Sequence, residues 1–164
     1  MSKDRATIDR ALALMFLVLA VIWAAVIFGF SSQDSYESAS LSGEVADVII
    51  ENFDVRTEHS ALEHYVRKTA HVCEYAVFAS LVFASAAFLL KSLGKSAYKA
   101  FFVSTLAALA YSASDEFHQS FVSGRSGEVK DVLIDTCGGI AAGLLICLVM
   151  KLVSSKRSGK QQQK

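Results

Sequence analysis

Charged, imidazole and phenol side chains recur at helical spacing in three stretches of this chain that are otherwise apolar. Residues three, four or seven positions apart lie on one face of a helix, so each stretch predicts a polar stripe. The three stripes consist, in chain order, of Lys68, His71, Glu74 and Tyr75; of Tyr111, Asp115, Glu116, His118 and Gln119; and of Asp131 and Asp135.

An ionisable side chain inside a membrane-spanning helix is costly, so it faces the helix bundle or a wet cavity and finds a partner there. We therefore expect the stripes to meet in one polar pocket. The groups that could exchange protons, and so carry catalysis, are His71, Glu74, Asp115, Glu116, His118 and Asp135. The groups that could hold a substrate are Lys68, Tyr75, Gln119, Arg125 and Asp131.

Two chemistries fit such a pocket. Lys68 and Arg125 could receive a phosphate or carboxylate head group, while His71 or His118 moves a proton. Alternatively, the carboxylates and imidazoles could hold a divalent metal ion as a cofactor, although the sequence has no known metal-binding spacing. No serine or threonine lies in the setting of a typical nucleophile, so the sequence leaves open whether the protein is an enzyme. A reaction, if there is one, would be hydrolysis or group transfer.

Four apolar blocks must position these stripes, at about residues 11–30, 70–90, 97–114 and 132–153. The chain is 53% hydrophobic and has no proline, which argues against a soluble domain. The first block has no charge and is long enough to cross a hydrocarbon layer of roughly 30 Å. Because it is longer than the apolar core of a typical signal peptide, we expect an uncleaved helix. The predicted fold is all-α, a four-helix transmembrane bundle that forms a single domain over residues 1–153.

Basic residues are sorted by side of the predicted membrane. Eleven of the 16 Lys and Arg lie before the first block, from the end of the second block to the start of the third, or from the end of the fourth block onward. The opposite ends of the blocks carry the other five bases and 14 of the 16 acids. The positive-inside rule therefore places both termini in the cytoplasm and the polar stripes at the outer face. Residues 154–164 are polar and predict a disordered cytoplasmic tail, and no basic domain is present that would bind nucleic acid.

The long outer segment 31–69 joins the first two blocks. Its apolar residues recur at helical spacing with acids between them, and they are Leu41, Val45, Val48, Ile49 and Phe53. This pattern predicts an additional amphipathic helical segment, lying at the membrane surface or capping the bundle.

Three motifs, in this order, resemble those of the VanZ-like family. They are Lys68-Thr69-Ala70-His71-x-x-Glu74-Tyr75, then Asp115-Glu116-Phe117-His118-Gln119-Ser120-Phe121, then Gly124-Arg125 with Asp131-x-x-x-Asp135-x-x-Gly138. The resemblance covers roughly residues 27–143. It departs from many relatives at Ser123, where they have a proline, and this predicts a less rigid turn. The resemblance implies a small bacterial membrane protein of the cell envelope, whose founding relative is associated with low-level teicoplanin resistance.

Two hypotheses of different class follow. In the first, the protein binds, and in one version modifies, a membrane lipid or lipid-linked envelope precursor at the outer face of the bacterial cytoplasmic (inner) membrane. This first hypothesis includes a role in glycopeptide (teicoplanin) tolerance. In the second, it is a non-enzymatic scaffold or accessory protein whose polar network is structural. A transporter would need a polar path to the inner face, and the inner halves of the predicted spans are almost wholly apolar.

Overall fold

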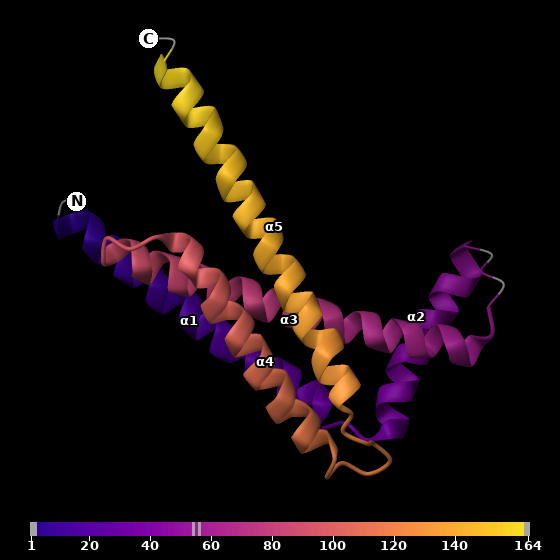
Figure 1. Cartoon of the computed structure of the whole chain (residues 1–164). Coiled ribbons are helices and arrows are strands. Elements are labelled where there is room, and N and C mark those ends of the chain that lie inside the picture. Colours follow the sequence, from indigo (N-terminus) through magenta and orange to yellow (C-terminus); the bar gives the residue numbers. More distant parts are fainter. Residues whose placement is uncertain (1–2, 54, 56, 163–164) are drawn as a thin grey trace.

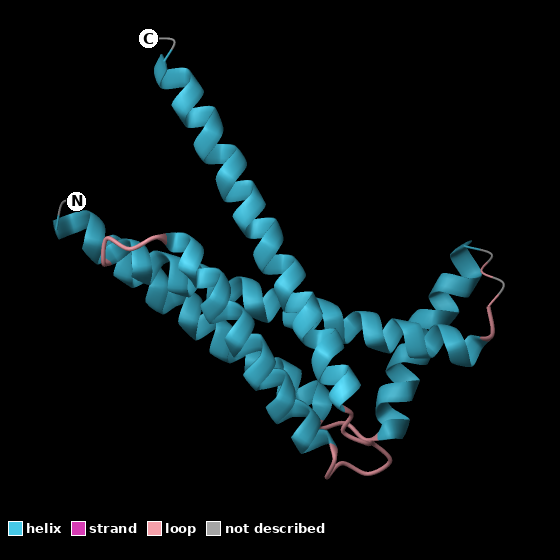
Figure 2. Cartoon of the chain, viewed as in Figure 1, coloured by secondary structure: helices cyan, strands magenta, loops and turns pink. Residues whose placement is uncertain are grey.

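In a computed structural model, the described part of the chain (residues 3–53, 55 and 57–162) is helical and contains no strand (Figure 2). Its helices, in chain order, are α1 (Lys3–Ser31), α2 (Ser35–Phe53), α3 (His59–Ser92), the 3₁₀ turn η1 (Ala97–Lys99), α4 (Ala100–Gln119) and α5 (Val129–Gln162). The predicted all-α class is confirmed. The segment for which the sequence predicted an additional outer helix is α2.

α3 is the central helix, because α1, α2, α4 and α5 all pack against it. α5 also packs on α4, and its C-terminal half then points away from the other helices (Figure 1). The start of α1, the α3–α4 connection and the end of α5 lie toward one side of the molecule (Figure 1). The α1–α2 and α4–α5 connections lie together at the opposite end, so the chain brings the polar ends of its helices to one place.

Local capping explains where two of these helices begin and end. Asp34 precedes α2, and its Oδ1 accepts a 2.8 Å hydrogen bond from the backbone N–H of Glu37, as an N-cap residue does. Gly94 follows α3 with a φ of 67°, a conformation that glycine adopts without strain. The N–H groups of Gly94 and Lys95 donate back to the carbonyls of Lys91 and Leu90, which closes the helix in a Schellman motif.

Apolar side chains face outward and polar side chains face inward, as expected for helices in hydrocarbon. Leu14, Val21 and Leu106 are 62%, 63% and 68% exposed, whereas Asp115 and Asp135 are 3% and 2% exposed. Water would penalise this distribution, but lipid solvates the apolar face and drives the ionisable groups together.

Three helices are long and apolar enough to cross a membrane: α1, α3 and α5, the last over Val129–Lys156. The protein is therefore a membrane-type helical protein. Among the described helices, α4 is outside that group, so the fourth span of the predicted bundle stays a prediction.

The packing of α2 agrees with the predicted amphipathic helix, whereas the end of α5 differs from its prediction. α2 contacts α3 through small buried residues, Ser38, Ser42 and Ala46, while its apolar stripe stays exposed. α5 continues to Gln162, so residues 154–162 are helical where the polar composition predicted disorder. Residues 163 and 164 of that predicted tail lie outside the described residues.

Candidate functional site

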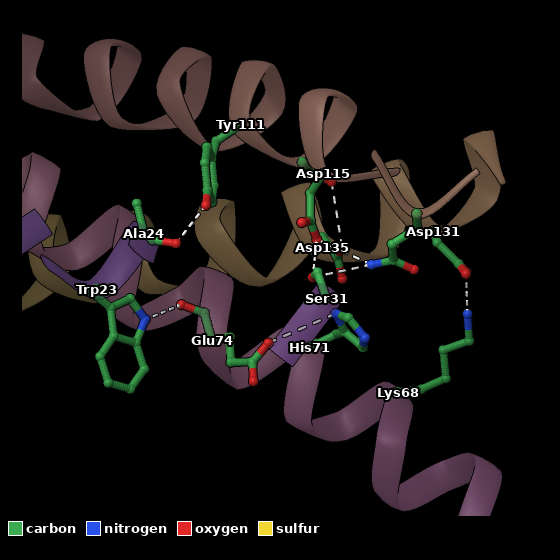
Figure 3. A network of polar contacts seen from close by, with 12 residues as sticks. Trp23, Ala24, Ser31, Lys68, His71, Glu74, Tyr111, Asp115, Asp131 and Asp135 are labelled. Atoms are coloured by element: carbon green, nitrogen blue, oxygen red, sulfur yellow. Dashed lines mark hydrogen bonds and ion pairs between the residues drawn. The ribbon is translucent and has the colours of Figure 1, made fainter. Parts of the chain in front are cut away.

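Close packing of α5 on α3 brings two of the polar stripes side by side. A Cβ atom at Gly138 would lie 2.6 Å from the carbonyl oxygen of Val72, nearer than real contacts allow, so the approach requires glycine. His71 is adjacent to Val72 in α3, and Asp135 lies one turn before Gly138 in α5. The glycine therefore sets how closely these two helices approach. Figure 3 shows His71 of α3 and Asp135 of α5 in the same polar cluster.

A buried hydrogen-bond network joins the end of α1 to α4. Ser31 donates from Oγ to Oδ2 of Asp115 at 2.8 Å. Gln119 donates from Nε2 to the same carboxylate oxygen at 3.2 Å and to Ser31 Oγ at 3.3 Å. All three side chains are buried. A carboxylate held by two donors in this way orients the helix ends that carry it.

Two more carboxylates tie α4 to the start of α5. The Oγ of Ser112 lies 3.4 Å from Oδ2 of the buried Asp135, as a hydrogen-bond donor. Oε2 of Glu116 accepts a 2.9 Å hydrogen bond from the backbone N–H of Glu128. Through these contacts the two carboxylates hold α4 against α5 and against the backbone that precedes α5.

A polar pocket of about 180 Å³ opens beside this network. We call it the arginine pocket, and its lining residues are Ser35, His64, Arg67, Lys68, His71, Gln119, Gly124, Arg125, Ser126, Glu128 and Asp131. A second pocket of about 190 Å³ adjoins it, because Arg67, His71 and Arg125 line both. We call this second cavity the side pocket.

The three cations of the arginine pocket differ in their partners. Lys68 forms an ion pair with Asp131 (Figure 3). Neither Arg67 nor Arg125 forms an ion pair within the described part of the chain. Burial lowers the pKa of the Arg125 guanidinium and the nearby charge of Arg67 lowers it further, whereas the charges of Asp115, Glu116 and Asp34 act to raise it. Because arginine carries a positive charge, two half-buried positive charges share one cavity.

His71 lines both pockets and has a carboxylate beside it. Its Nδ1 lies 3.8 Å from Oε2 of Glu74, one helical turn further along α3, which is too long for a hydrogen bond. A short movement would let Glu74 orient the ring and let His71 exchange a proton with a ligand. The other predicted imidazole, His118, is elsewhere: it stacks on Phe28 of α1 and lies 3.3 Å from the Oγ of Ser32.

The family model of VanZ/LLP1 matches residues 16–151, which is most of the chain and includes all three motifs. The chain belongs to the VanZ/LLP1 family. This confirms the resemblance to VanZ-like proteins that the motifs carry. No curated protein and no solved structure matches the chain.

The VanZ/LLP1 motifs supply two kinds of residue to this site. Six of the predicted site residues line a pocket: Lys68, His71, Gln119, Arg125 and Asp131 the arginine pocket, and Glu74 the side pocket. The other five line neither pocket, and they are Tyr75, Asp115, Glu116, His118 and Asp135. Asp115, Glu116 and Asp135 instead hold the VanZ/LLP1 helices together.

Sequence reasoning did not include Arg67 or the exposed His64 among the site residues. Arg67 lies four and His64 seven residues before His71, so both lie on the α3 face that carries it. That spacing was the available signal. It was weak because both residues precede the apolar block in a solvated, charged segment.

A metal centre was one of the alternatives that the sequence left open. Within residues 3–53, 55 and 57–162 no group of three or more His, Cys, Asp or Glu side chains is placed to hold a metal ion. The arginine pocket can hold an anion, because two guanidinium groups that form no ion pair within these ranges line it, although the exposed carboxylate of Glu128 lines it too.

Proposed function

We propose that this VanZ/LLP1 protein binds the anionic head group of a membrane lipid or lipid-linked envelope precursor in the arginine pocket. The observation that carries the proposal is the pair of guanidinium groups, Arg67 and Arg125, which share the pocket without an ion pair among the described residues. Like charges held together repel each other, and a phosphate between them would relieve the repulsion. Arginine also offers two parallel donors that match phosphate oxygens.

The pocket would face the outer leaflet of the bacterial cytoplasmic membrane. Basic residues gather at the helix ends opposite to the site, which favours cytoplasmic termini. α4 is 20 residues long, or about 30 Å at helical rise, and would serve as the fourth span beside α1, α3 and α5. A head group of the outer leaflet would then lie at the depth of the arginine pocket.

Modification of the bound head group is a second step of the proposal. His71 would move a proton, with Glu74 orienting its ring, while Lys68 stays paired with Asp131. The pocket offers no serine in the setting of an activated nucleophile, so water would be the attacking group in a hydrolysis.

A structural role for part of the polar cluster is favoured by a separate observation. Ser31, Asp115 and Gln119 are buried and bonded to one another, and Gln119 alone of the three lines the arginine pocket. The scaffold hypothesis therefore fits the deep network, and the ligand hypothesis fits the pocket. Their variants separate the two: Asp115→Asn would lower stability, whereas Arg125→Ala would lower ligand binding.

Titration of methyl phosphate into the protein, reconstituted in phosphatidylcholine nanodiscs, tests the proposal. Calorimetry is expected to detect binding that weakens as salt screens the two charges. The double variant Arg67→Ala/Arg125→Ala is expected to lose it, while Lys130→Ala, an exposed base that lines neither pocket, keeps it. Equal binding by the parent and the double variant would refute the proposal.

A role in teicoplanin tolerance, which the family resemblance implies, would depend on the same pocket. Cells that express Arg125→Ala or His71→Ala at normal protein levels are expected to lose any tolerance that the parent confers. Tolerance retained by both variants would separate the phenotype from the pocket.

A further inference from the structure

The side pocket has an apolar wall beside the charged groups that it shares with the arginine pocket. Phe30 from the end of α1, Leu41 from α2 and Ala70 from α3 line this wall. The shared groups Arg67 and Arg125 also line the side pocket. The two pockets therefore form one continuous site, with guanidinium groups in one part and hydrocarbon side chains in the other.

The apolar wall is open toward the membrane rather than closed in the core. Phe30 and Leu41 are 44% and 49% exposed. Leu41 also begins the exposed apolar stripe of α2, which continues through Val45 and Val48. α2 runs across the direction of α1 rather than along it, so α2 lies at the end of the bundle where the outer leaflet would be (Figure 1). Hydrocarbon would solvate this stripe, and the side pocket lies at its edge.

We propose that the site takes a phosphate that carries an apolar chain, with the phosphate between Arg67 and Arg125 and the first part of the chain in the side pocket. This inference rests on the proposed function for its charged half. Its apolar half rests on the side pocket alone. A free phosphate would occupy the arginine pocket and leave the apolar wall of Phe30 and Leu41 without a contact.

Two probes that differ only in their chain separate a lipid-type ligand from a free phosphate. Methyl phosphate has the head group, and hexyl phosphate adds five methylene groups to it. Each buried methylene contributes about fourfold in affinity, so three of them in the side pocket would give about 60-fold tighter binding of hexyl phosphate. Calorimetric titration of both probes into the full-length protein in phosphatidylcholine nanodiscs measures this ratio.

Phe30→Ser and Leu41→Ser are expected to weaken binding of hexyl phosphate about tenfold and to leave binding of methyl phosphate unchanged. The unchanged methyl phosphate affinity also shows that each variant has folded. The matched controls are Phe121→Ser and Val48→Ser, because these apolar residues are 73% and 57% exposed and line neither pocket. Both controls are expected to behave as the parent.

The outcomes separate the two proposals. Equal affinity of the parent for both probes, or no effect of Phe30→Ser and Leu41→Ser on hexyl phosphate, overturns the apolar half and leaves the head-group site standing. Binding of both probes that persists in Arg67→Ala/Arg125→Ala overturns the charged half, and the inference falls with it.

Discussion

Gly138 offers a direct test of whether α5 and α3 pack as closely as the polar site requires. In Gly138→Ala the new methyl group would lie 2.6 Å from the carbonyl oxygen of Val72, against about 3.3 Å for an ordinary carbon–oxygen contact. The helices must therefore separate by about 0.7 Å locally. The obstacle is backbone, so no side-chain rotation relieves it, and overpacking of this kind costs about 1–3 kcal/mol.

Gly29→Ala is the matched control, because a Cβ atom there meets nothing within 4 Å. Both substitutions gain the same helix propensity, about 0.5–1 kcal/mol, so the difference between the two variants isolates the packing cost. The assay is unfolding by SDS in mixed micelles, followed by the fluorescence of Trp23, the chain's one tryptophan. We expect Gly138→Ala to be about 1–3 kcal/mol less stable than Gly29→Ala. Equal stability would refute the close contact and the site geometry built on it.

Further predictions use the same unfolding assay or a topology reporter. Lys68→Met leaves Asp131 unpaired and should lower the free energy of unfolding by about 1 kcal/mol, since the pair is partly exposed. Adding Asp131→Leu should restore the stability. If it does not, the result would contradict the ion pair. Ser31→Ala removes a buried hydrogen-bond donor to Asp115 and should lower the free energy of unfolding by about 1–3 kcal/mol. An unchanged unfolding midpoint would argue against that hydrogen-bond network. Reporter fusions at Lys95 and at the C-terminus should both give a cytoplasmic signal, and a periplasmic signal at either would refute the topology.

The sequence predicts the elements well, because hydrocarbon imposes strong rules on composition. Long segments without charge, the absence of proline and the distribution of Lys and Arg to one side of the membrane are enough to expect transmembrane helices. The same rules explain why polar stripes on different helices face one another. They do not say how far each helix continues, so the sequence predicted disorder over residues 154–164, where α5 continues to Gln162.

The sequence could not predict which residues of the polar cluster are buried in the structural network and which line a pocket. Asp115 and Glu74 have the same chemistry and similar spacing, yet one is bonded to Ser31 in the interior and the other lines a pocket. Arg67 was missed because its role depends on Arg125, which lies on a distant loop. Only the fold brings these two guanidinium groups into one cavity, and no local pattern records that.

The orientation of α2 shows a similar limit. Its apolar stripe predicted a helix correctly, but an apolar stripe packs against protein in water and against lipid in a membrane. Small residues such as Ser42 and Ala46 make the contact with α3 instead. Their size allows close approach, which is the usual device of helices in hydrocarbon.

Native mass spectrometry of the gently purified protein tests the central claim most directly, because it measures the mass of any membrane lipid that stays bound to the protein. We expect the parent to retain a lipid with a phosphate head group, and Arg67→Ala/Arg125→Ala to release it while Lys130→Ala retains it. An identical lipid adduct on the parent and the double variant would contradict a head-group site built on the two arginines.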